Sequence, residues 1–596
     1  MKVLGVTTEY ESGAAAVEDG RIVSAVNEER LLRIKLAAGF PRRSIDCVLE
    51  LAGWEAGDLD AVLVAGEYDL YTGEAGPSSG WFEFRPVGFG RWLKRSVGAR
   101  LARFREALPW LETGYYAVLG PSFRRRRRII RDVLRDDFGI RCPIVFVDHH
   151  FCHATSAYFT GGMRDALVAS LDGGGDGKSS RVYAVRDGSF EEIAETSAYN
   201  SLGNYYAYVT HLCGFKAHKH EGKITGLAAH GRPVYRDLLA EFVTEDHGRL
   251  LNTGRVVFDD AVKEIQRRLP AGWRREDLAA SVQLLFEELA GRWLDHWARD
   301  SGLRDVALAG GVFANVRVNQ ALHESSLVDR LYVHPGMGDG GLAVGAGLAA
   351  CVDGVLPETM PAVSAPLADV YLGPDLTTGE VEIALAAAGL EPEPADASLA
   401  GSVAELLADG FVVARAAGRM EYGPRALGNR SILYHPADPS VNDWLNVNLK
   451  RTEFMPFAPA VLWEHREACF EGLEGAELAA RFMTMTFRCT PWMREHMPGV
   501  VHIDGTARPQ LVERAGNPGY YDILAAFHRL TGLPAVVNTS FNMHEEPIVC
   551  SAEDCVRAFL AARIDYLAIG PYLVRHPNQE ARQRRVLKRN AGAARC

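Results

Sequence analysis

Three short apolar runs, separated by polar turns, open this chain and predict strands of a β-sheet. The runs are residues 1–6, 14–17 and 22–26. Asp19-Gly20, between the second and third runs, is a strong signal for a two-residue hairpin turn. The same pattern returns at residues 166–171 and 180–186, on either side of a glycine-rich turn. Two such hairpins predict a duplicated α/β architecture with a cleft between its halves.

Helical segments and a proline-rich break divide the rest of the chain. Residues 276–300 predict a long helix that leads to a buried strand at 306–309, and residues 342–350 predict a helix of small residues. Four prolines between residues 352 and 374 interrupt any regular element. We therefore expect an N-terminal domain over residues 1–351, a linker over 352–374, a second α/β domain with mixed strands over 375–576, and a basic tail over 577–596.

A segment rich in Arg, Trp and Phe, residues 76–141, predicts a helical insertion in the first domain. It would cover a substrate site or only embellish the fold. Its five consecutive arginines, residues 124–128, would either contact phosphate or RNA or form the solvated face of a helix. Because no aromatic residues for base stacking are interleaved with them, we favour the solvated face.

Composition narrows the class of protein. A chain of 596 residues is too long for one hydrophobic core, and 47% hydrophobic with 24% charged residues is typical of a soluble globular protein. No apolar run approaches the roughly 20 residues that span a bilayer. The chain starts directly with a predicted core strand, so we expect no secretory signal and a cytoplasmic location. Ten cysteines without CxxC pairs indicate free thiols, and a net charge of −11 argues against nucleic acid as a partner.

The most informative segment is residues 147–158, which places His149 and His153 four residues apart at a predicted strand-to-helix junction. Residues at this spacing share a helix face, so both rings can reach one metal ion, although such pairs also occur without one. Two later glycine-rich turns each present a carboxylate, Asp172 and Asp339. Two imidazoles and two carboxylates form a suitable ligand set for iron, manganese or zinc.

Arginines and lysines in the second half of the chain indicate an anionic substrate. The glycine-marked loop 418–431 carries Arg425 and Arg430. Further cations and polar groups follow it: Lys450, Arg451, Arg508 and Asn538. An arginine fork matches phosphate or carboxylate oxygens, so convergence of these side chains would form a phosphate site. Any one arginine alone is more often part of a surface ion pair.

Six sequence blocks make the chain recognisable. They are His149-x-x-x-His153, Glu-Gly-Lys-Ile-Thr-Gly-Leu-Ala-Ala-His-Gly at 221–231, Gly-Gly-Val-Phe-Ala-Asn at 310–315, Gly-Pro-Arg-Ala-Leu-Gly-Asn-Arg-Ser at 423–431, Met-Pro-Phe-Ala-Pro at 455–459 and Asn-Thr-Ser-Phe-Asn at 538–542. In this order they closely resemble the O-carbamoyltransferase family of NodU and of the cephamycin and tobramycin carbamoyltransferases. The resemblance runs from Met1 to about His576.

This resemblance implies a fold and a reaction. The N-terminal part would be a TsaD-like, actin-type ATPase domain of the ASKHA class, and the C-terminal part a YrdC-like domain. In relatives, the YrdC-like domain converts carbamoyl phosphate and ATP into carbamoyl adenylate and pyrophosphate. The carbamoyl group then passes to a substrate hydroxyl in the TsaD-like domain, with loss of AMP. The partners implied are carbamoyl phosphate and a hydroxyl-bearing small molecule, which we expect to be a natural product.

Residue roles carry over from the resemblance in three groups. Carbamoyl phosphate and ATP would contact Arg425, Arg430, Ser431, Lys450, Arg451, Arg508 and Asn538, with Arg425 and Lys450 taking part in catalysis. A divalent metal, with iron favoured over manganese, magnesium and zinc, would be held by His149, His153, Asp172 and Asp339. The nucleotide pocket would be lined by Gly173, Gly174, Gly310, Gly311, Asn315 and Gly340, with Glu221 and Lys223 close by.

The first polar turn departs from the family pattern. Relatives usually carry His-Asp where this chain has Tyr10-Glu11, and that histidine is the natural base for the acceptor hydroxyl. A phenol with a pKa of about 10 is a poor base at neutral pH, and a carboxylate near 4.3 needs a raised pKa. Glu11, His150 or no strong base at all would serve here, and we favour Glu11.

Two other functions stay open from the sequence. One is threonylcarbamoyl-adenylate chemistry on tRNA, which uses the same two modules; the acidic net charge and the HHxxH start of the motif argue against it. The other is an actin-like, nucleotide-dependent chaperone or binding module, which would have no use for the arginine loops. The acceptor has no readable signature, and a homodimer is the default expectation.

Overall fold

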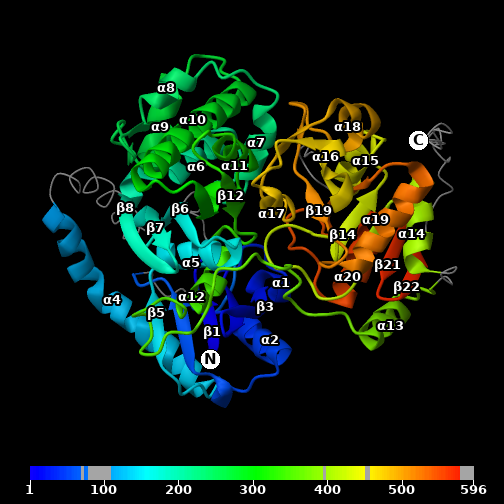
Figure 1. Cartoon of the computed structure of the whole chain (residues 1–596), viewed down its shortest axis with the longest axis horizontal. Helices are drawn as coiled ribbons and strands as arrows, with labels where there is room; N and C mark the ends of the chain where they lie inside the picture. Colours follow the sequence, from blue (N-terminus) through cyan, green and yellow to red (C-terminus); the bar gives the residue numbers. More distant parts are fainter. Residues whose placement is uncertain (69–72, 78–108, 393–397, 450–456, 578–596) are drawn as a thin grey trace. The chain divides into compact units, whose positions relative to one another are not determined.

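The computed structural model describes residues 1–68, 73–77, 109–392, 398–449 and 457–577. It divides the chain into two compact units, both of mixed α/β structure (Figure 1). Unit 1 comprises Met1–Val23 and Leu36–Pro366, and unit 2 comprises Ser24–Lys35 and Leu367–Cys596. None of the described helices is both long enough and apolar enough to cross a membrane.

The first sheet of unit 1 has the strand order β3-β2-β1-β4-β5. Its strands are β1 (Lys2–Thr7), β2 (Gly13–Glu18), β3 (Arg21–Asn27, whose last residues belong to unit 2), β4 (Ala61–Ala65) and β5 (Ile144–Val147). β1 is antiparallel to β2 and parallel to β4, and β4 is parallel to β5. Asp19 and Gly20, both with positive φ, connect β2 to β3, so the predicted tight turn is confirmed.

The second sheet of unit 1 repeats this pattern with the order β12-β11-β6-β7-β8. Its strands are β6 (Asp165–Gly175), β7 (Lys178–Arg186), β8 (Ser189–Ser197), β11 (Asp305–Ala309) and β12 (Arg330–Val333). β6 is antiparallel to β7 and parallel to β11, and β11 is parallel to β12. The two sheets therefore share one strand order and one pattern of directions, which is the duplication that the two hairpins predict.

Helices of unit 1 connect and cover these sheets (Figure 1). They are α2 (Arg42–Ala52), α4 (Pro109–Asp136), α5 (His149–Gly161), α6 (Leu202–Leu212), α7 (Glu221–Ala228), α8 (Arg236–Ala240), α9 (Phe258–Arg268), α10 (Arg275–Ser301), α11 (Val316–His323) and α12 (Leu342–Ala349); a small ribbon, β9 (Thr244–Asp246) and β10 (Arg249–Leu251), lies among them in the sequence. The helices predicted at 276–300 and 342–350 are α10 and α12. α4 falls in the predicted insertion, of which residues 78–108 lie outside the described residues.

Small residues let α12 pack tightly against two neighbouring elements. A Cβ atom at Gly345 would lie 1.8 Å from the carbonyl oxygen of Cys152 in α5. Thr155 of α5 also donates its hydroxyl to the carbonyl of Gly345, at 2.7 Å. A Cβ at Gly5 in β1 would lie 1.9 Å from the carbonyl oxygen of Ala343. Glycine at these positions permits the close approach that fixes α5 relative to the start of α12.

Unit 2 contains a seven-stranded sheet of order β19-β15-β20-β14-β13-β21-β22. Its strands are β13 (Val413–Ala416), β14 (Arg430–Tyr434), β15 (Ala458–Leu462), β19 (Gln510–Val512), β20 (Ala535–Ser540), β21 (Tyr566–Ile569) and β22 (Tyr572–Arg575); a three-stranded sheet holds β16 (Phe470–Glu471), β17 (Phe487–Cys489) and β18 (Thr506–Ala507). The directions are mixed, as predicted, because β13 is parallel to β21 and antiparallel to β14. A helix, α14 (Leu399–Ala408), precedes the first of these strands, β13, in the sequence.

The helices of unit 2 are mostly short. They are α1 (Glu28–Leu32), α13 (Thr378–Ala387), α14 (Leu399–Ala408), α15 (Val441–Asn448), α16 (Arg466–Cys469), α17 (Glu477–Ala480), α18 (Pro491–His496), α19 (Pro518–Thr531) and α20 (Ala552–Ala562). α14 and α19 pack together in the core of the large sheet around the buried Leu407 and Phe527. α1, far away in the sequence, joins this unit through Arg30, which donates to the carbonyl of Gly423 at 2.7 Å.

Candidate functional site

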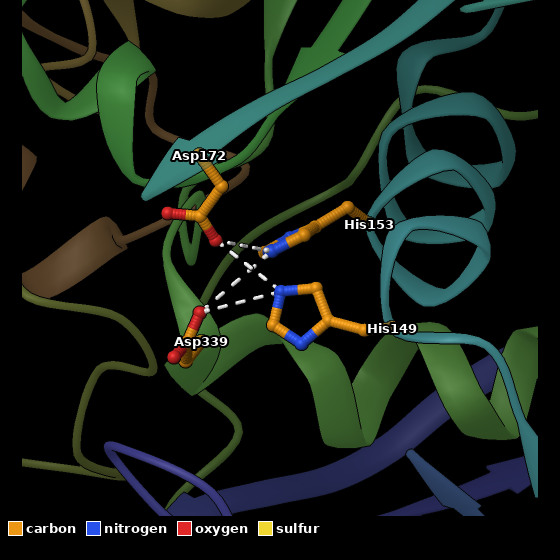
Figure 2. A group of neighbouring side chains, drawn as sticks. All are labelled: His149, His153, Asp172 and Asp339. Carbon is orange, nitrogen blue, oxygen red and sulfur yellow. Dashed lines mark hydrogen bonds and ion pairs between the residues drawn. The ribbon is translucent and has the colours of Figure 1, made fainter. Parts of the chain in front are cut away.

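Four side chains of unit 1 converge at one point, with one ligand atom of each within 4.8 Å of the others. Nε2 of His149 lies 3.2 Å from Oδ2 of Asp172 and 3.8 Å from Oδ1 of Asp339. Nε2 of His153 lies 3.3 Å and 3.8 Å from the same two atoms. Figure 2 shows both rings and both carboxylates pointing toward a common centre. The structure thus brings together the four residues predicted as metal ligands.

The local sequence explains how these groups are held. Asp148 caps the first turn of α5 by accepting a hydrogen bond from the Phe151 amide at 2.9 Å. The His149 ring packs directly on Gly175, where a Cβ would lie 2.2 Å from Cγ of the ring. The carboxylate of Asp172 packs against Gly311 in the same way, with a Cβ there 2.8 Å from Oδ1. Glycines beside two of the ligands therefore make the space that the ligands occupy.

Burial and mutual charge control protonation in this cluster. Burial raises the pKa of Asp339 well above its usual range, and the charge of Asp172 adds to the effect. Burial would also raise the pKa of Asp172, but hydrogen bonds from His149 and His153 outweigh it and hold the pKa well below its usual range. Burial opposes a proton on His149, yet the Glu9 carboxylate raises its pKa well above 6.5. A bound cation would replace such shared protons and satisfy all four groups.

The first polar turn lies beside this cluster. Glu9 places Oε2 2.9 Å from Nδ1 of His149. Glu11, with a positive φ of 52°, accepts a hydrogen bond from the Gly340 amide at 3.0 Å, next to the fourth ligand in the sequence. Tyr10 lies between these two carboxylates in the sequence and is half-buried. The structure therefore brings Glu11 and Gly340 together, both of which the sequence analysis selected.

Most glycines predicted to line a nucleotide pocket surround Asp172. Gly310, with φ of 117°, packs so closely on β6 that a Cβ would lie 2.4 Å from the carbonyl oxygen of Leu171. Gly173 follows the ligand directly, and a Cβ there would lie 3.6 Å from Cε1 of His218. Gly174 continues the same turn, which connects to β7.

The side chain of Asn315, predicted to line the nucleotide pocket, bonds within the protein. Its side-chain oxygen accepts hydrogen bonds from the amides of Arg317 and Val318, both at 3.2 Å, and so caps α11. Its amide nitrogen donates to Gln283 at 2.8 Å. Since both ends of the amide are engaged within the protein, the Asn315 side chain holds the fold at this position, and its contact with a nucleotide stays a prediction.

Glu221 and Lys223 lie at the start of α7. The Glu221 carboxylate accepts a hydrogen bond from the His218 amide at 2.5 Å, and burial raises its pKa to about 7. The ammonium of Lys223 lies 5.6 Å from the centre of the Phe215 ring. Glu221 thus orders the loop that brings the His218 ring to Gly173, whereas Lys223 packs on an aromatic face.

In unit 2, two of the predicted arginines, Arg425 and Arg508, form a half-buried cationic pair. Burial lowers the pKa of Arg425 to about 10, and burial together with the charge of Arg425 lowers the pKa of Arg508 well below 12.5. Within the described part of the chain, the Nε atoms of both side chains are buried without a hydrogen-bond partner. Two neighbouring half-buried cations whose Nε atoms have no acceptor are costly in a folded protein, unless an anion joins them.

Arg430 and Ser431, which were also predicted to bind substrate, do not belong to this pair, and their side chains bond within the protein. Arg430 is fully buried, and its guanidinium donates to the backbone carbonyls of residues 417, 418, 429 and 550 at 2.8–3.4 Å. The Ser431 hydroxyl accepts a hydrogen bond from the Gly428 amide at 2.9 Å. Both side chains therefore stabilise the loop that presents Arg425. The buried Glu421 carboxylate does the same, because it accepts the amides of Leu427, Asn429 and Arg430 at 2.7–3.1 Å.

Asn538 lies on β20, and its side chain contacts the loop that carries Arg425. Its amide donates to Oε1 of Gln510 at 2.7 Å and to the carbonyl of Ala426 at 3.1 Å. Its own side-chain oxygen is buried and has no hydrogen-bond partner among the described residues. Asn538 is thus next to the residue that follows Arg425 in the chain. Lys450 and Arg451, also predicted to bind substrate, lie outside the described residues.

Glu9 and Arg126, one arginine of the run 124–128, are residues near the cluster that were not predicted from the sequence. Arg124, Arg125 and Arg128 are exposed, as a solvated helix face requires, but Arg126 is only 1% exposed. The interpretation as a solvated face is therefore wrong for Arg126. A signal was present, because residue 126 shares helical spacing with the apolar Phe123 and Ile130. Glu9 had no such signal beyond its place in the polar turn.

Comparison with known proteins gives matches along nearly the whole chain. The family model described as "Carbamoyltransferase N-terminus" matches residues 2–348, and that described as "Carbamoyltransferase C-terminus" matches residues 404–576. The nodulation protein NolNO of Sinorhizobium fredii is 34% identical over 95% of this chain and 79% of its own length. The nodulation protein NolO of Bradyrhizobium diazoefficiens is 37% identical over 72% of this chain and 79% of its own length. Among solved structures, the ROK hexokinase of Thermus thermophilus covers 58% of this chain and 98% of its own at 15% identity and a TM-score of 0.27, too low to identify a shared fold.

Proposed function

This chain belongs to the carbamoyltransferase family, and from this premise we propose that it is an ATP-dependent O-carbamoyltransferase that works in two steps. In the first step, water cleaves carbamoyl phosphate to carbamate and inorganic phosphate, and a carbamate oxygen then attacks the α-phosphorus of ATP, which gives carbamoyl adenylate and releases pyrophosphate. In the second step, an acceptor hydroxyl attacks the carbamoyl carbon, the bond to the phosphate oxygen breaks, and AMP leaves. The acceptor is a small molecule, and a natural product is the class that we propose.

The observation that carries the first step is the half-buried pair of Arg425 and Arg508. Carbamoyl phosphate brings a dianionic phosphate, which matches two guanidinium groups whose buried Nε atoms lack an acceptor among the described residues. Binding the anion would offset the desolvation of both cations and would neutralise charge when ATP is attacked. Asn538, whose buried side-chain oxygen is unpaired, would add a polar contact at the same place.

The second step needs a site that stabilises the adenylate phosphate, and the four-residue cluster of unit 1 suits a divalent metal. Two imidazole nitrogens and two carboxylates within 4.8 Å form a donor set that accommodates iron, manganese or zinc, and magnesium less well because it prefers oxygen. When bound by His149, His153, Asp172 and Asp339, such an ion would supply Lewis acidity toward phosphate oxygens. We propose iron as the resident ion.

The acceptor hydroxyl must lose its proton as it attacks. Glu11 is our candidate for this general base, because its carboxylate is anchored by the Gly340 amide beside the metal cluster. The alternatives that the sequence leaves open are His150 and a reaction without a strong base.

The arrangement of strands in the two units supports the proposed use of ATP. The repeated strand order of the two sheets in unit 1 is what an actin-like, TsaD-like ATPase domain requires, and we assign residues 1–351 to that domain. The mixed seven-stranded sheet of unit 2 is assigned to the YrdC-like, adenylate-forming domain over residues 375–576. Family membership favours this function over a chaperone and over tRNA modification.

The experiment that tests this function needs no acceptor. The purified full chain is incubated with ATP, carbon-labelled carbamoyl phosphate and Fe²⁺ or Mn²⁺, and the products are analysed for pyrophosphate and labelled carbamoyl adenylate. Both products are expected, and each should depend on both substrates. Release of ADP and phosphate, without pyrophosphate, would point to a different ATP reaction and would contradict the proposal.

A further inference from the structure

The two imidazoles of the metal cluster differ on the side that faces away from it. Nδ1 of His149 lies 2.9 Å from Oε2 of Glu9. Nδ1 of His153 is buried and has no hydrogen-bond partner among the described residues. Only His149 therefore has a carboxylate that can fix which ring nitrogen carries the proton and which faces the other ligands.

The space that Glu9 occupies is made by Gly66. A Cβ at Gly66 would lie 2.2 Å from Oε1 of Glu9 and 3.5 Å from Nη2 of Arg126. Gly66 also has a φ of 84°, which other residues rarely adopt, and its amide donates to the carbonyl of Val147 at 2.8 Å. The Glu9 carboxylate is therefore enclosed by backbone on one side and by the His149 ring on another.

Arg126, a residue of α4, bonds to both chain segments that surround the Glu9 carboxylate. Nη1 donates to the carbonyl of Gly66 at 2.6 Å, and Nη2 donates to the hydroxyl of Thr8 at 2.9 Å. Thr8 precedes Glu9 in the turn, so one buried guanidinium bonds to a residue on each side of the carboxylate. The charge of Arg126 also favours the ionised form of Glu9. None of the other arginines in the run 124–128 is as deeply buried.

We propose that Glu9 and Arg126 are positioning residues of the metal centre: Glu9 accepts a hydrogen bond from Nδ1–H of His149, which leaves Nε2 free to bind the ion, and Arg126 keeps the Glu9 carboxylate in place. A carboxylate behind a ligating histidine orients the ring and makes it a stronger donor. This inference rests on the metal site of the proposed function. It gives the arginine run a role that neither substrate binding nor helix solvation supplies.

The test measures metal binding instead of turnover. The full chain, freed of metal by a chelator, is titrated with Co²⁺ in competition with a chelator of known affinity, and the visible absorption of bound Co²⁺ is recorded. Glu9→Gln keeps the size of the side chain and should weaken Co²⁺ binding about 10- to 100-fold, with a shifted visible band. Arg126→Met should weaken it less, about 3- to 10-fold, because it acts through Glu9. Arg125→Met, at an exposed position of the same run, is the matched control and should leave both readouts unchanged.

The outcomes separate this inference from the function on which it rests. If the parent protein binds Co²⁺ and the folded Glu9→Gln variant binds it with the same affinity and the same spectrum, the inference is wrong, while carbamoyl transfer stands. If the parent protein binds no Co²⁺, the proposed metal centre fails and the inference fails with it. Should Glu9→Gln not fold, Arg126→Lys keeps the charge but not the two-pronged contact, and an unshifted band in that variant would equally overturn the proposal.

Discussion

The Glu9 carboxylate lies 2.9 Å from Nδ1 of His149, on the side of the imidazole opposite to Nε2, which faces Asp172 at 3.2 Å. The ring therefore connects a residue of the N-terminal turn to one at the end of β6. Such a connection gives the ring a defined orientation before any ion binds, which reduces the cost of organising the site.

Loss of one ligand should abolish metal binding at the cluster. His153→Ala and Asp339→Ala each remove a donor atom from a buried site that has four, and we expect about a 100-fold or greater loss of affinity for Fe²⁺ or Co²⁺. Metal content after reconstitution, measured by elemental analysis, checks this. His150→Asn is the control, since the His150 ring is buried next to the cluster but bonds to Ser170 at 3.0 Å. A variant of His153 that retains stoichiometric metal would remove it from the ligand set.

Replacing Arg425 or Arg508 by Met should weaken substrate binding without lowering the stability of the fold. Removing a half-buried cation whose Nε has no acceptor should leave the free energy of unfolding unchanged or raise it by about 1–2 kcal/mol in the absence of ligands. Carbamoyl phosphate should bind about 10- to 100-fold more weakly, because a charge-assisted hydrogen bond is lost. Thermal unfolding and isothermal titration measure the two effects.

Arg430→Met, in contrast, should lower the stability of the fold. Its guanidinium bonds to several buried carbonyls, which would lose their donors, so we expect a loss of about 2–4 kcal/mol of stability. Chemical denaturation of the purified variant gives this value. If Arg430→Met were as stable as the parent and Arg425→Met were unstable, the roles assigned to the two arginines would have to be exchanged.

Glu11→Gln should impair the second step alone. Glutamine keeps an oxygen for the Gly340 amide but cannot take a proton, so transfer to the acceptor should fall by about 10²- to 10⁴-fold. Pyrophosphate release without acceptor should persist. Tyr10→Phe provides the control in the same turn, with a small effect expected. Unchanged acceptor transfer in Glu11→Gln would remove Glu11 as the general base.

Glu221→Gln should change how stability depends on pH. Burial raises the Glu221 pKa from 4.5 to about 7. The folded state therefore binds more protons than the unfolded state between these values, and the contribution of this group to stability falls as the pH rises through that window. The variant should exceed the parent by up to about 3 kcal/mol at pH 8 and should match it near pH 4.5. Denaturation at several pH values tests this, with the exposed Glu405→Gln as control; parallel stability curves for Glu221→Gln and the parent would contradict the assignment.

Local signals in the sequence account for the parts of the fold that were predicted. The Asp19-Gly20 turn depends on positive φ at two adjacent residues, and this preference is encoded in those residues themselves. The pairing of His149 with His153 likewise follows from helix geometry. Asp172 and Asp339 were found because each follows an apolar strand and is flanked by glycines, which is a local pattern as well.

The remaining features depend on contacts between residues far apart in the chain. Glu9 and His149 are separated by 140 positions, and no local pattern connects them. Arg425 and Arg430 belong to one loop with one composition, yet one guanidinium lacks acceptors and the other donates to several carbonyls. Sequence pattern alone cannot separate these two cases, because the path of the surrounding backbone decides which arginine is satisfied.

The two-step reaction is tested most directly by measuring both partial reactions in Arg508→Met and in His153→Ala, with each variant checked for folding. The first partial reaction is pyrophosphate release from ATP and carbamoyl phosphate without acceptor; the second is transfer from carbamoyl adenylate supplied ready-made to an acceptor hydroxyl. We predict that Arg508→Met loses the first and keeps the second, and that His153→Ala keeps the first and loses the second. Equal loss of both partial reactions in both folded variants would contradict a division of the chemistry between the arginine pair and the histidine–carboxylate cluster.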